Sequence, residues 1–279
     1  MPEGPEIRRA ADSIEAAIRG KEITGVVFTH PHLKQWQQPL TGSRVIAVET
    51  RGKAMLTRFS NGLNLYTHNQ LYGRWYCVAA SRMPDTRRQL RVAIHTHDQS
   101  ALLYSASEIA VLTESEVETH PFLSRLGPDV LSAQTTIEIL LQRLMDERFR
   151  RRQLATLLTD QSFIAGIGNY LRCEILFICR LHPSVKPIQL SQQQLALLAQ
   201  SLLDVPRQSY ASGGITHDLA TAKKMMQHGV VLEDARFWLF RREGKACYRC
   251  GATIMRQNSG GQPCYLCPQC QKSGMVTAT

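Results

Sequence analysis

Five of the eight cysteines lie between positions 247 and 270, and four of them form two Cys-x2-Cys pairs. The pairs Cys247/Cys250 and Cys267/Cys270 are separated by sixteen residues, a spacing typical of a four-cysteine zinc site. Each pair can turn two thiolates toward one ion, and four thiolates complete a tetrahedron without an open position. The spacing therefore predicts one structural Zn²⁺, with a redox pair as the alternative. Cys264 fits neither pair and is interpreted as a non-ligand.

The N-terminus reads Met1-Pro2-Glu3-Gly4-Pro5-Glu6. Removal of Met1 would expose the secondary amine of Pro2. That amine can attack a sugar C1′ or an aldehyde and give an iminium ion, an electron sink that needs no proton. Glu3 and Glu6 can exchange protons with a sugar oxygen or a base. Proline and glutamate are also ordinary residues at a helix start, so this fragment alone favours a structural role over catalysis.

The charge balance points to a polyanion. The chain has 33 Lys and Arg against 23 Asp and Glu, a net charge of +10, which commonly marks a nucleic-acid partner. A generally basic surface is the alternative. No apolar run approaches the ~18–20 residues of a membrane span, and the N-terminus has neither a basic leader nor an apolar segment. We expect a cytoplasmic, nucleoid-associated protein with no membrane partner.

Hydrophobic periodicity predicts an α+β fold. Residues 5–19 carry one apolar stripe and predict a leading helix, ended by Gly20. Short runs separated by turn residues then predict a β-sandwich or barrel. The predicted strands are 23–28, 45–49, 54–59, 63–67, 75–78, 90–95 and 101–104.

The pattern becomes helical beyond His120-Pro121. The predicted helices are 136–145, 152–158, 169–179 and 192–203. The segment 209–229 contains Gly213-Gly214 and little periodicity, so it predicts a mobile linker.

Several motifs follow one another in a fixed order. They are Pro2-Glu3-Gly4-Pro5-Glu6, Arg51-Gly52-Lys53, His68-Asn69-Gln70-Leu71-Tyr72-Gly73, Gly166-Ile167-Gly168-Asn169 and the two cysteine pairs. In this combination the sequence resembles the formamidopyrimidine-DNA glycosylase/endonuclease VIII family. Gln70-Leu71-Tyr72 and Asn169-Tyr170-Leu171-Arg172 resemble its endonuclease VIII branch. The resemblance extends from residue 2 to about residue 271.

The resemblance implies a fold and an activity. Residues 2–126 would form the catalytic β-sandwich with its leading helix. Residues 127–234 would form a helix–two-turn–helix domain with the mobile linker, and residues 235–271 a zinc-finger hairpin. The implied protein is a monomeric DNA glycosylase/AP lyase of base excision repair. It would remove oxidised pyrimidines from double-stranded DNA and cleave the strand at abasic sites.

The resemblance also implies a role for individual residues. Pro2 would be the Schiff-base nucleophile, Glu3 the proton donor that opens the deoxyribose, and Lys53 the proton donor associated with β-elimination. The implied DNA contacts are Gln70, Arg125 and Asn169.

Reaching C1′ inside a duplex requires turning the nucleotide out of the stack. Leu71 and Tyr72 could fill the vacated space, because apolar wedges kink DNA, although both could be plain hairpin residues. Asn169 begins a predicted helix, where a phosphate binds readily, and it could equally be the N-cap. Lys53 and Arg125, taken alone, could be surface charges.

The sequence departs from the family pattern at two positions. An arginine expected five residues before the third zinc cysteine is replaced by Gln262, and another in the loop after the Ser-Tyr-Ala segment is replaced by Gly213. Glutamine cannot reproduce a bidentate cationic phosphate contact. We therefore expect weak δ-elimination, with Arg256 as a poorly placed substitute. The alternative function is a non-catalytic binder of damaged or distorted DNA, but the joint presence of Pro2, Glu3, Glu6 and Lys53 favours the enzyme.

Overall fold

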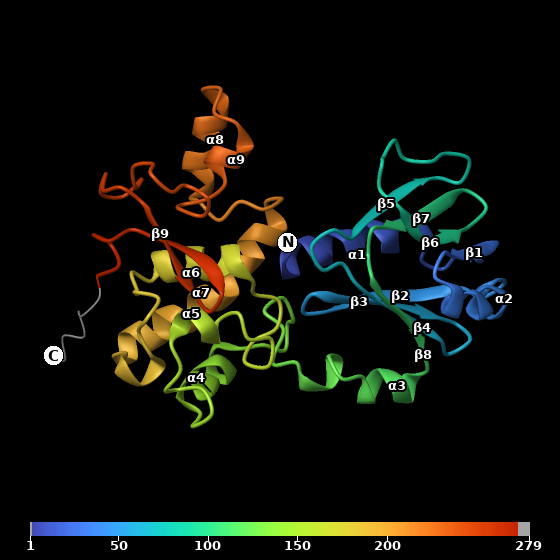
Figure 1. Cartoon of the computed structure of the whole chain (residues 1–279), viewed down its shortest axis with the longest axis horizontal. Helices are drawn as coiled ribbons and strands as arrows, with labels where there is room; N and C mark the ends of the chain where they lie inside the picture. Colours follow the sequence, from blue (N-terminus) through green and yellow to red (C-terminus); the bar gives the residue numbers. More distant parts are fainter. Residues whose placement is uncertain (1, 273–279) are drawn as a thin grey trace. The chain divides into compact units, whose positions relative to one another are not determined.

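The computed structural model describes residues 2–272 (Figure 1). The chain divides into two compact units, Met1–Arg125 and Leu126–Thr279. Among the described residues, no helix combines the length and the apolar composition needed to cross a membrane.

The first unit begins with helix α1 (Gly4–Ile18), as predicted. Glu3 occupies the N-cap position, and the Glu6 carboxylate accepts a hydrogen bond from the Glu3 backbone N–H at 3.1 Å. This reciprocal arrangement satisfies a donor that a helix start leaves open. Ile7, Ile14 and Ile18 are fully buried, so one face of the helix belongs to the core.

Two antiparallel four-stranded sheets follow α1 (Figure 1). The first contains, in order, β2 (Val45–Arg51), β3 (Ala54–Phe59), β4 (Asn64–His68) and β8 (Glu108–Leu112). The second contains β1 (Gly25–Phe28), β6 (Leu90–His95), β7 (Gln99–Tyr104) and β5 (Arg74–Ala79). One apolar core joins residues of α1 and of both sheets. The predicted β-sandwich with a leading helix is confirmed.

Short segments complete this unit. They are η1 (Pro31–Trp36), α2 (Gln37–Leu40), α3 (Glu114–Thr119) and η2 (Leu123–Arg125). Neither β8 nor α3 was expected from periodicity. β8 pairs with β4 and sets Glu108 opposite His68.

The second unit is helical and ends in a hairpin. Its helices are α4 (Ile137–Met145), α5 (Leu154–Leu157), α6 (Asn169–Ile178), η3 (Pro187–Gln189), α7 (Gln192–Ala211), α8 (Leu219–Gln227) and α9 (Leu232–Ala235). The hairpin strands are β9 (Met255–Ser259) and β10 (Gln262–Leu266). Residues 170–177 of α6 are all buried, which makes α6 the central helix of this unit.

The segment 209–229, predicted as a mobile linker because of its weak periodicity, contains helical structure. α7 continues to Ala211, past the end predicted for it, and residues 219–227 form α8, whose N-cap Asp218 accepts from Thr221 N at 2.8 Å. Thr216 and His217 are almost fully buried. α8 contains Lys223-Lys224 followed by Met225-Met226, and these pairs interrupt the alternation of apolar and polar residues by which a helix is predicted from sequence.

The hairpin packs along α6. At its tip, Pro263 O accepts a hydrogen bond from Asn169 at the start of α6. Half-way along, Cys173 and Phe177 of α6 share a buried cluster with Cys264. Near the hairpin base, Gln271 Nε2 donates to Leu181 O just past the end of α6. The helix therefore supports the hairpin from tip to base.

Candidate active site and DNA-binding elements

The β2–β3 turn delivers Lys53 to the interior of the first unit. Gly52 holds a positive φ of 61°, which suits a tight two-residue turn between Arg51 and Ala54. Only 7% of Lys53 and 2% of Glu3 are exposed. Burial lowers the pKa of Lys53, and the nearby Glu3 carboxylate opposes that shift. The structure thus brings Glu3, the neighbour of Pro2 in sequence, close to Lys53.

Glu6 is committed to the helix start. Besides accepting from the Glu3 N–H, its carboxylate pairs with Arg9 at 2.9 Å. The expectation that Glu6 exchanges protons with substrate is therefore weaker than the same expectation for Glu3.

His68 extends this polar cluster from the end of β4, where it lies opposite Ala54, next to Lys53. Burial lowers the pKa of His68, the Glu108 carboxylate raises it, and the Lys53 charge lowers it. Its ring also stands edge-on to Phe122, with centroids 5.3 Å apart. His68 and Glu108 were missed as individual site residues, although His68 opens a motif that the sequence singled out.

Gln70 is firmly oriented by its neighbours. Its Nε2 donates to Glu108 at 2.9 Å, and its Oε1 accepts from Ser107 Oγ at 2.8 Å. Its backbone N–H donates to His68 Nδ1 at 3.2 Å, and its φ of 46° is unusual for a residue other than glycine.

The next two residues form the exposed tip of this loop. Leu71 is 61% and Tyr72 69% exposed. Arg88 Nη1 donates a hydrogen bond to Tyr72 O at 2.5 Å. A side chain at Gly73 would approach Asn69 O to 2.6 Å, so the loop closes tightly there. A tightly closed loop therefore presents two large apolar side chains to solvent.

Arg125 lies at the end of the first unit. It is exposed on η2, and its Nε donates to Pro121 O at 2.6 Å. Among the described residues this is its one side-chain hydrogen bond, so most of its guanidinium donors stay available for a phosphate.

Asn169 is the first residue of α6, and Gly168 rather than Asn169 takes the N-cap position. The Asn169 amide donates to Pro263 O at 2.9 Å, and its Oδ1 accepts from Arg172 Nη2 at 2.5 Å. Arg172 is fully buried and also donates to the carbonyls of Ala155 and Ser259. The Asn169 side chain therefore ties the helix start to the hairpin.

Gln262 lies at the tip of the hairpin. It is exposed and pairs with Ser259 across Gly260-Gly261. Arg256 pairs with Tyr265, three residues from Gln262 along β10. Odd spacing in a strand reverses the face, and three residues span about 10 Å. Arg256 also forms an ion pair with Glu243 at 3.8 Å. Its side chain does not occupy the place of an arginine at 262.

The four predicted ligand cysteines converge. The sulfur atoms of Cys247, Cys250, Cys267 and Cys270 all lie within 4.8 Å of one another. Four thiolates without a carboxylate or histidine suit a closed, structural Zn²⁺ centre. Cys264 stands apart from this group, as expected, and its sulfur lies 3.9 Å from that of Cys173. The cluster is consistent with one structural zinc.

Comparison with known proteins agrees with this arrangement. Residues 1–107 match the formamidopyrimidine-DNA glycosylase N-terminal domain, and residues 126–221 match the formamidopyrimidine-DNA glycosylase H2TH domain. An endonuclease 8 from Enterobacter sp. (strain 638) is 51% identical over 98% of this chain and its own full length. An endonuclease 8 from Escherichia coli O17:K52:H18 is 52% identical over 97% of this chain and its own full length.

The chain belongs to the formamidopyrimidine-DNA glycosylase/endonuclease VIII family. The predicted helix–two-turn–helix region is thereby confirmed. Because the similarity to the endonuclease 8 relatives covers nearly the whole chain and their full length, the chain is a DNA glycosylase/AP lyase of base excision repair, as expected from its motifs.

Solved structures share the fold at lower identity. A complex between the Lactococcus lactis Fpg protein and DNA containing an abasic site superposes with a TM-score of 0.79 at 21% identity, covering 97% of this chain and 100% of that chain. A complex of the same enzyme with DNA containing an oxidised pyrimidine gives 0.80 at 20% identity, covering 98% of this chain and 100% of that chain.

Proposed function

We propose that this enzyme removes oxidised pyrimidines from double-stranded DNA through a Schiff base on Pro2 and cleaves the abasic strand by β-elimination. The observation that carries the proposal is the buried pair of Lys53 and Glu3, since Glu3 directly follows Pro2 in the chain. An ammonium and a carboxylate in a water-poor position can move protons at the sugar that the proline attacks. The enzyme would act as a monomer on nucleoid DNA in the cytoplasm.

The reaction begins once Met1 is removed. The Pro2 nitrogen attacks C1′, the bond from C1′ to the base breaks, and the base leaves with that electron pair and takes up the proton that the attacking nitrogen loses. The Glu3 carboxyl gives a proton to O4′ as the C1′–O4′ bond breaks, and the nitrogen lone pair forms the iminium ion. This ion acidifies the C2′ proton, which passes to the Glu3 carboxylate left after the protonation of O4′. The C2′–H electron pair forms the C2′=C3′ bond as the C3′–O3′ bond breaks, and Lys53 gives its proton to the departing 3′ phosphate. Hydrolysis of the iminium ion then releases the free amine.

Other residues of the first unit would hold the opened duplex. Leu71 and Tyr72 would enter the stack in place of the turned-out nucleotide, at a cost of a few kcal/mol for unstacking. Gln70, fixed by Glu108 and Ser107, would direct them. Arg125 would contact a phosphate from the end of this unit, residues 2–126 being its catalytic domain.

In the second unit, residues 127–234 would bind DNA and residues 235–271 would form the finger. The backbone N–H groups at the start of α6 favour a phosphate next to Asn169. The zinc ion would take no part in the chemistry, because four cysteines leave it no open position. Gln262 offers no cation at the hairpin tip, so δ-elimination should be weak.

The non-catalytic binder of damaged DNA considered from the sequence is set aside, because full-length similarity to the endonuclease 8 relatives makes the chain an enzyme. Borohydride reduction on an abasic duplex tests the role of Pro2, because only an amine nucleophile leaves a covalent adduct. We expect adduct formation by the native protein and none by Pro2→Gly. Glu3→Gln should lose base excision more than cleavage of a preformed abasic site. Normal trapping by protein that demonstrably retains Met1 would refute the role of Pro2.

A further inference from the structure

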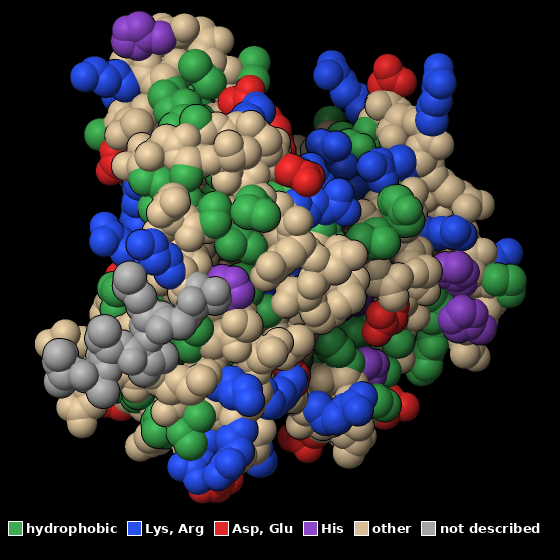
Figure 2. Space-filling model, turned by 60° about the vertical axis from the view of Figure 1, so that its left-hand side comes forward, with side chains coloured by type: hydrophobic (Ala, Val, Ile, Leu, Met, Phe, Trp, Pro, Cys, Tyr) green, Lys and Arg blue, Asp and Glu red, His purple; other side chains and the backbone are tan. Residues whose placement is uncertain are grey.

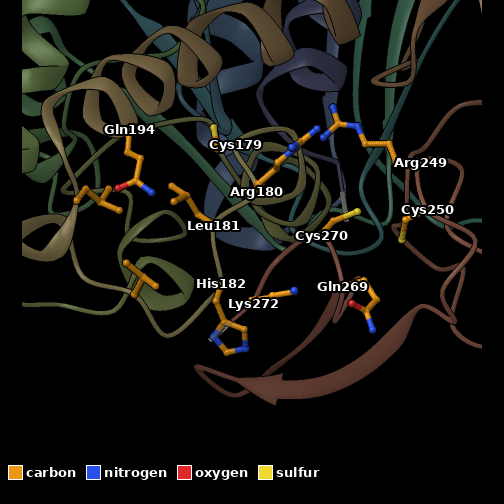
Figure 3. Close-up of a pocket in the computed structure, with 12 residues that line it drawn as sticks. Cys179, Arg180, Leu181, His182, Gln194, Arg249, Cys250, Gln269, Cys270 and Lys272 are labelled. Atoms are coloured by element: carbon orange, nitrogen blue, oxygen red, sulfur yellow. The ribbon is translucent and has the colours of Figure 1, made fainter. Parts of the chain in front are cut away.

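The second unit contains a cavity of about 590 Å³ at the end of α6 opposite Asn169 (Figure 3). The turn after α6, the segment leading to α7 and the zinc-binding loops all contribute to its wall. α6 has 10 residues, so this end lies about 15 Å from the helix start. The cavity is thus separate from the hairpin tip and from the proposed phosphate contact of Asn169.

Three strong cations line this cavity: Arg180, Arg249 and Lys272. None of its lining residues is Asp or Glu. Within residues 2–272, no carboxylate forms an ion pair with any of the three. In the view of Figure 3, the Arg180 and Arg249 side chains extend toward each other. Charges of one sign gathered without a partner suit an anionic ligand.

Arg249 is held in place. Its Nη1 donates to Phe177 O at 3.3 Å, and its guanidinium lies over the rings of Phe177 and Trp238 at 4.6 Å and 4.9 Å. These contacts fix the charge at the cavity wall without neutralising it.

Arg180 occupies a backbone position that glycine prefers. Its φ is 55°, and the bonds Arg180 N to Phe177 O and Leu181 N to Leu176 O close the end of α6. This is the helix-ending turn in which a glycine usually takes the left-handed residue. An arginine there is strained relative to glycine, and strain of this kind clusters at ligand sites.

The remaining wall is partly apolar. Leu181, Val185 and Leu190 contribute to it, and Leu181 is almost fully buried. Phosphate groups alone make no use of such a surface. The lining includes no Phe, Tyr or Trp on which a nucleobase would stack. The combination suits a ligand that carries carboxylates beside an aliphatic side chain.

We propose that this cavity binds a short acidic peptide segment of a partner protein, with carboxylates on Arg180, Arg249 and Lys272 and one aliphatic side chain against Leu181, Val185 and Leu190. Recognition of acidic motifs by clustered arginines is a common mode of peptide binding. The site would let a partner bind the enzyme without occupying the proposed DNA contacts of α6 and the hairpin tip.

The zinc centre offers a competing explanation for these cations. Four thiolates around one Zn²⁺ carry a net charge of about −2, and Cys250 and Cys270 line the same cavity. If the cations only balance that charge, their loss will weaken zinc retention and leave peptide binding unaffected. The two explanations therefore predict different measurements.

The test uses the zinc-loaded full chain and the labelled peptide Asp-Asp-Leu-Asp-Asp with blocked ends. Its Asn-Asn-Leu-Asn-Asn and Asp-Asp-Ser-Asp-Asp counterparts separate the charged contribution from the apolar one. Arg180→Gly removes the positive charge and places a glycine at a backbone position with a positive φ, which glycine adopts without strain. Arg241→Gly is the matched control, because Arg241 also has a positive φ, of 59°, and does not line the cavity.

Fluorescence anisotropy should show binding of the acidic leucine peptide, about tenfold weaker to Arg180→Gly and unchanged for Arg241→Gly. Both counterpart peptides should bind to the native protein more weakly than the acidic leucine peptide does.

Equal binding of the acidic leucine peptide by Arg180→Gly and Arg241→Gly would overturn the proposal. So would loss of zinc from Arg180→Gly without a change in peptide affinity. Displacement of the peptide by inorganic phosphate or undamaged duplex at matched charge would assign the cavity to phosphate groups instead. None of these outcomes depends on glycosylase activity.

Discussion

The two units surround their buried charges differently. In the helical unit, the Glu174 carboxylate is fully buried and accepts from the backbone N–H groups of Trp238, Leu239 and Phe240 at 2.7, 3.0 and 2.9 Å. The Thr216 hydroxyl adds a fourth bond at 2.6 Å. In the first unit, the described residues provide no hydrogen bond or ion pair to the Lys53 ammonium, and the nearby Glu3 carboxylate acts on it through its charge.

This difference distinguishes buried charges that stabilise the fold from buried charges that can take part in a reaction. A buried charge whose bonding capacity is filled by backbone groups fixes the chain around it and has nothing left for a substrate. A buried charge with unused capacity is costly to keep, and such groups concentrate where a reaction needs them. On the surface the charge is positive in balance: in Figure 2, Lys and Arg side chains are more frequent than Asp and Glu on the face in view.

The largest expected effect tests the support of the hairpin. Cys250→Ser removes one of four zinc ligands, and zinc sites of this kind contribute on the order of 10 kcal/mol to folding. We expect the variant to lose most of its zinc, the β9–β10 hairpin to lose hydrogen-exchange protection, and DNA binding to weaken. The first unit should keep its protection.

Cys264→Ala is the control for that experiment, because Cys264 is a buried cysteine of the same hairpin outside the four-sulfur group. It should retain about one zinc per chain, as expected for a complete four-cysteine site. A full zinc complement in Cys250→Ser, or loss of zinc in Cys264→Ala, would show that the ligand set is wrong.

The second expected effect concerns Glu174. Glu174→Gln replaces an acceptor-only group by an amide that presents two N–H donors to backbone N–H groups. Breaking a buried charged network of this kind costs about 3 kcal/mol. Hydrogen exchange at Trp238, Leu239 and Phe240 should accelerate about a hundredfold. Glu138→Gln, on the exposed side of α4, should leave these amides unchanged. Unaltered protection in Glu174→Gln would mean that its bonds are dispensable.

The third prediction addresses Lys53. Burial lowers its pKa below the ordinary 10.5, so the unfolded chain binds more protons than the folded chain between the two values. Lys53 therefore reduces the free energy of unfolding at neutral pH, and this penalty fades as the pH rises through the lowered pKa. Lys53→Met should be as stable as the native protein or more stable, by about 0–2 kcal/mol at pH 7, with a smaller difference near pH 10.

Urea unfolding at several pH values, followed by hydrogen exchange in the first unit, measures that difference. The same variant should lose at least about a hundredfold in β-elimination on a preformed abasic site. A variant that is both less stable at pH 7 and fully active would place Lys53 among the structural charges, with Glu174.

Sequence reasoning succeeded where function depends on local spacing. The zinc ligands come in two tight pairs, so neighbouring residues suffice to predict the four-sulfur cluster. Lys53 was singled out only through the family resemblance, and its catalytic role stays a prediction. Sequence reasoning failed where partners are distant. Gln70 is oriented by Glu108, 38 positions later, and Asn169 by Pro263, 94 positions later. Glu174 was not noticed, because nothing in its surrounding helix indicates the loop whose N–H groups it accepts.

The smallest expected effect is a gain at Gln262. The hairpin tip is well supported by Asn169 and Arg172, so Gln262→Arg should place a cation without disturbing the fold. We expect more δ-product and faster excision of thymine glycol, and a salt dependence steeper by about one phosphate contact. Reaction products resolved on a denaturing gel and binding at several salt concentrations measure these changes.

Arg256→Gln is the matched control, since Arg256 lies on the opposite face of the hairpin and pairs with Glu243. This variant should change neither the reaction products nor the salt dependence of binding. If the native protein already gives clean δ-product and Arg256→Gln abolishes it, Arg256 reaches the DNA after all, and the hairpin must then twist away from the register described above.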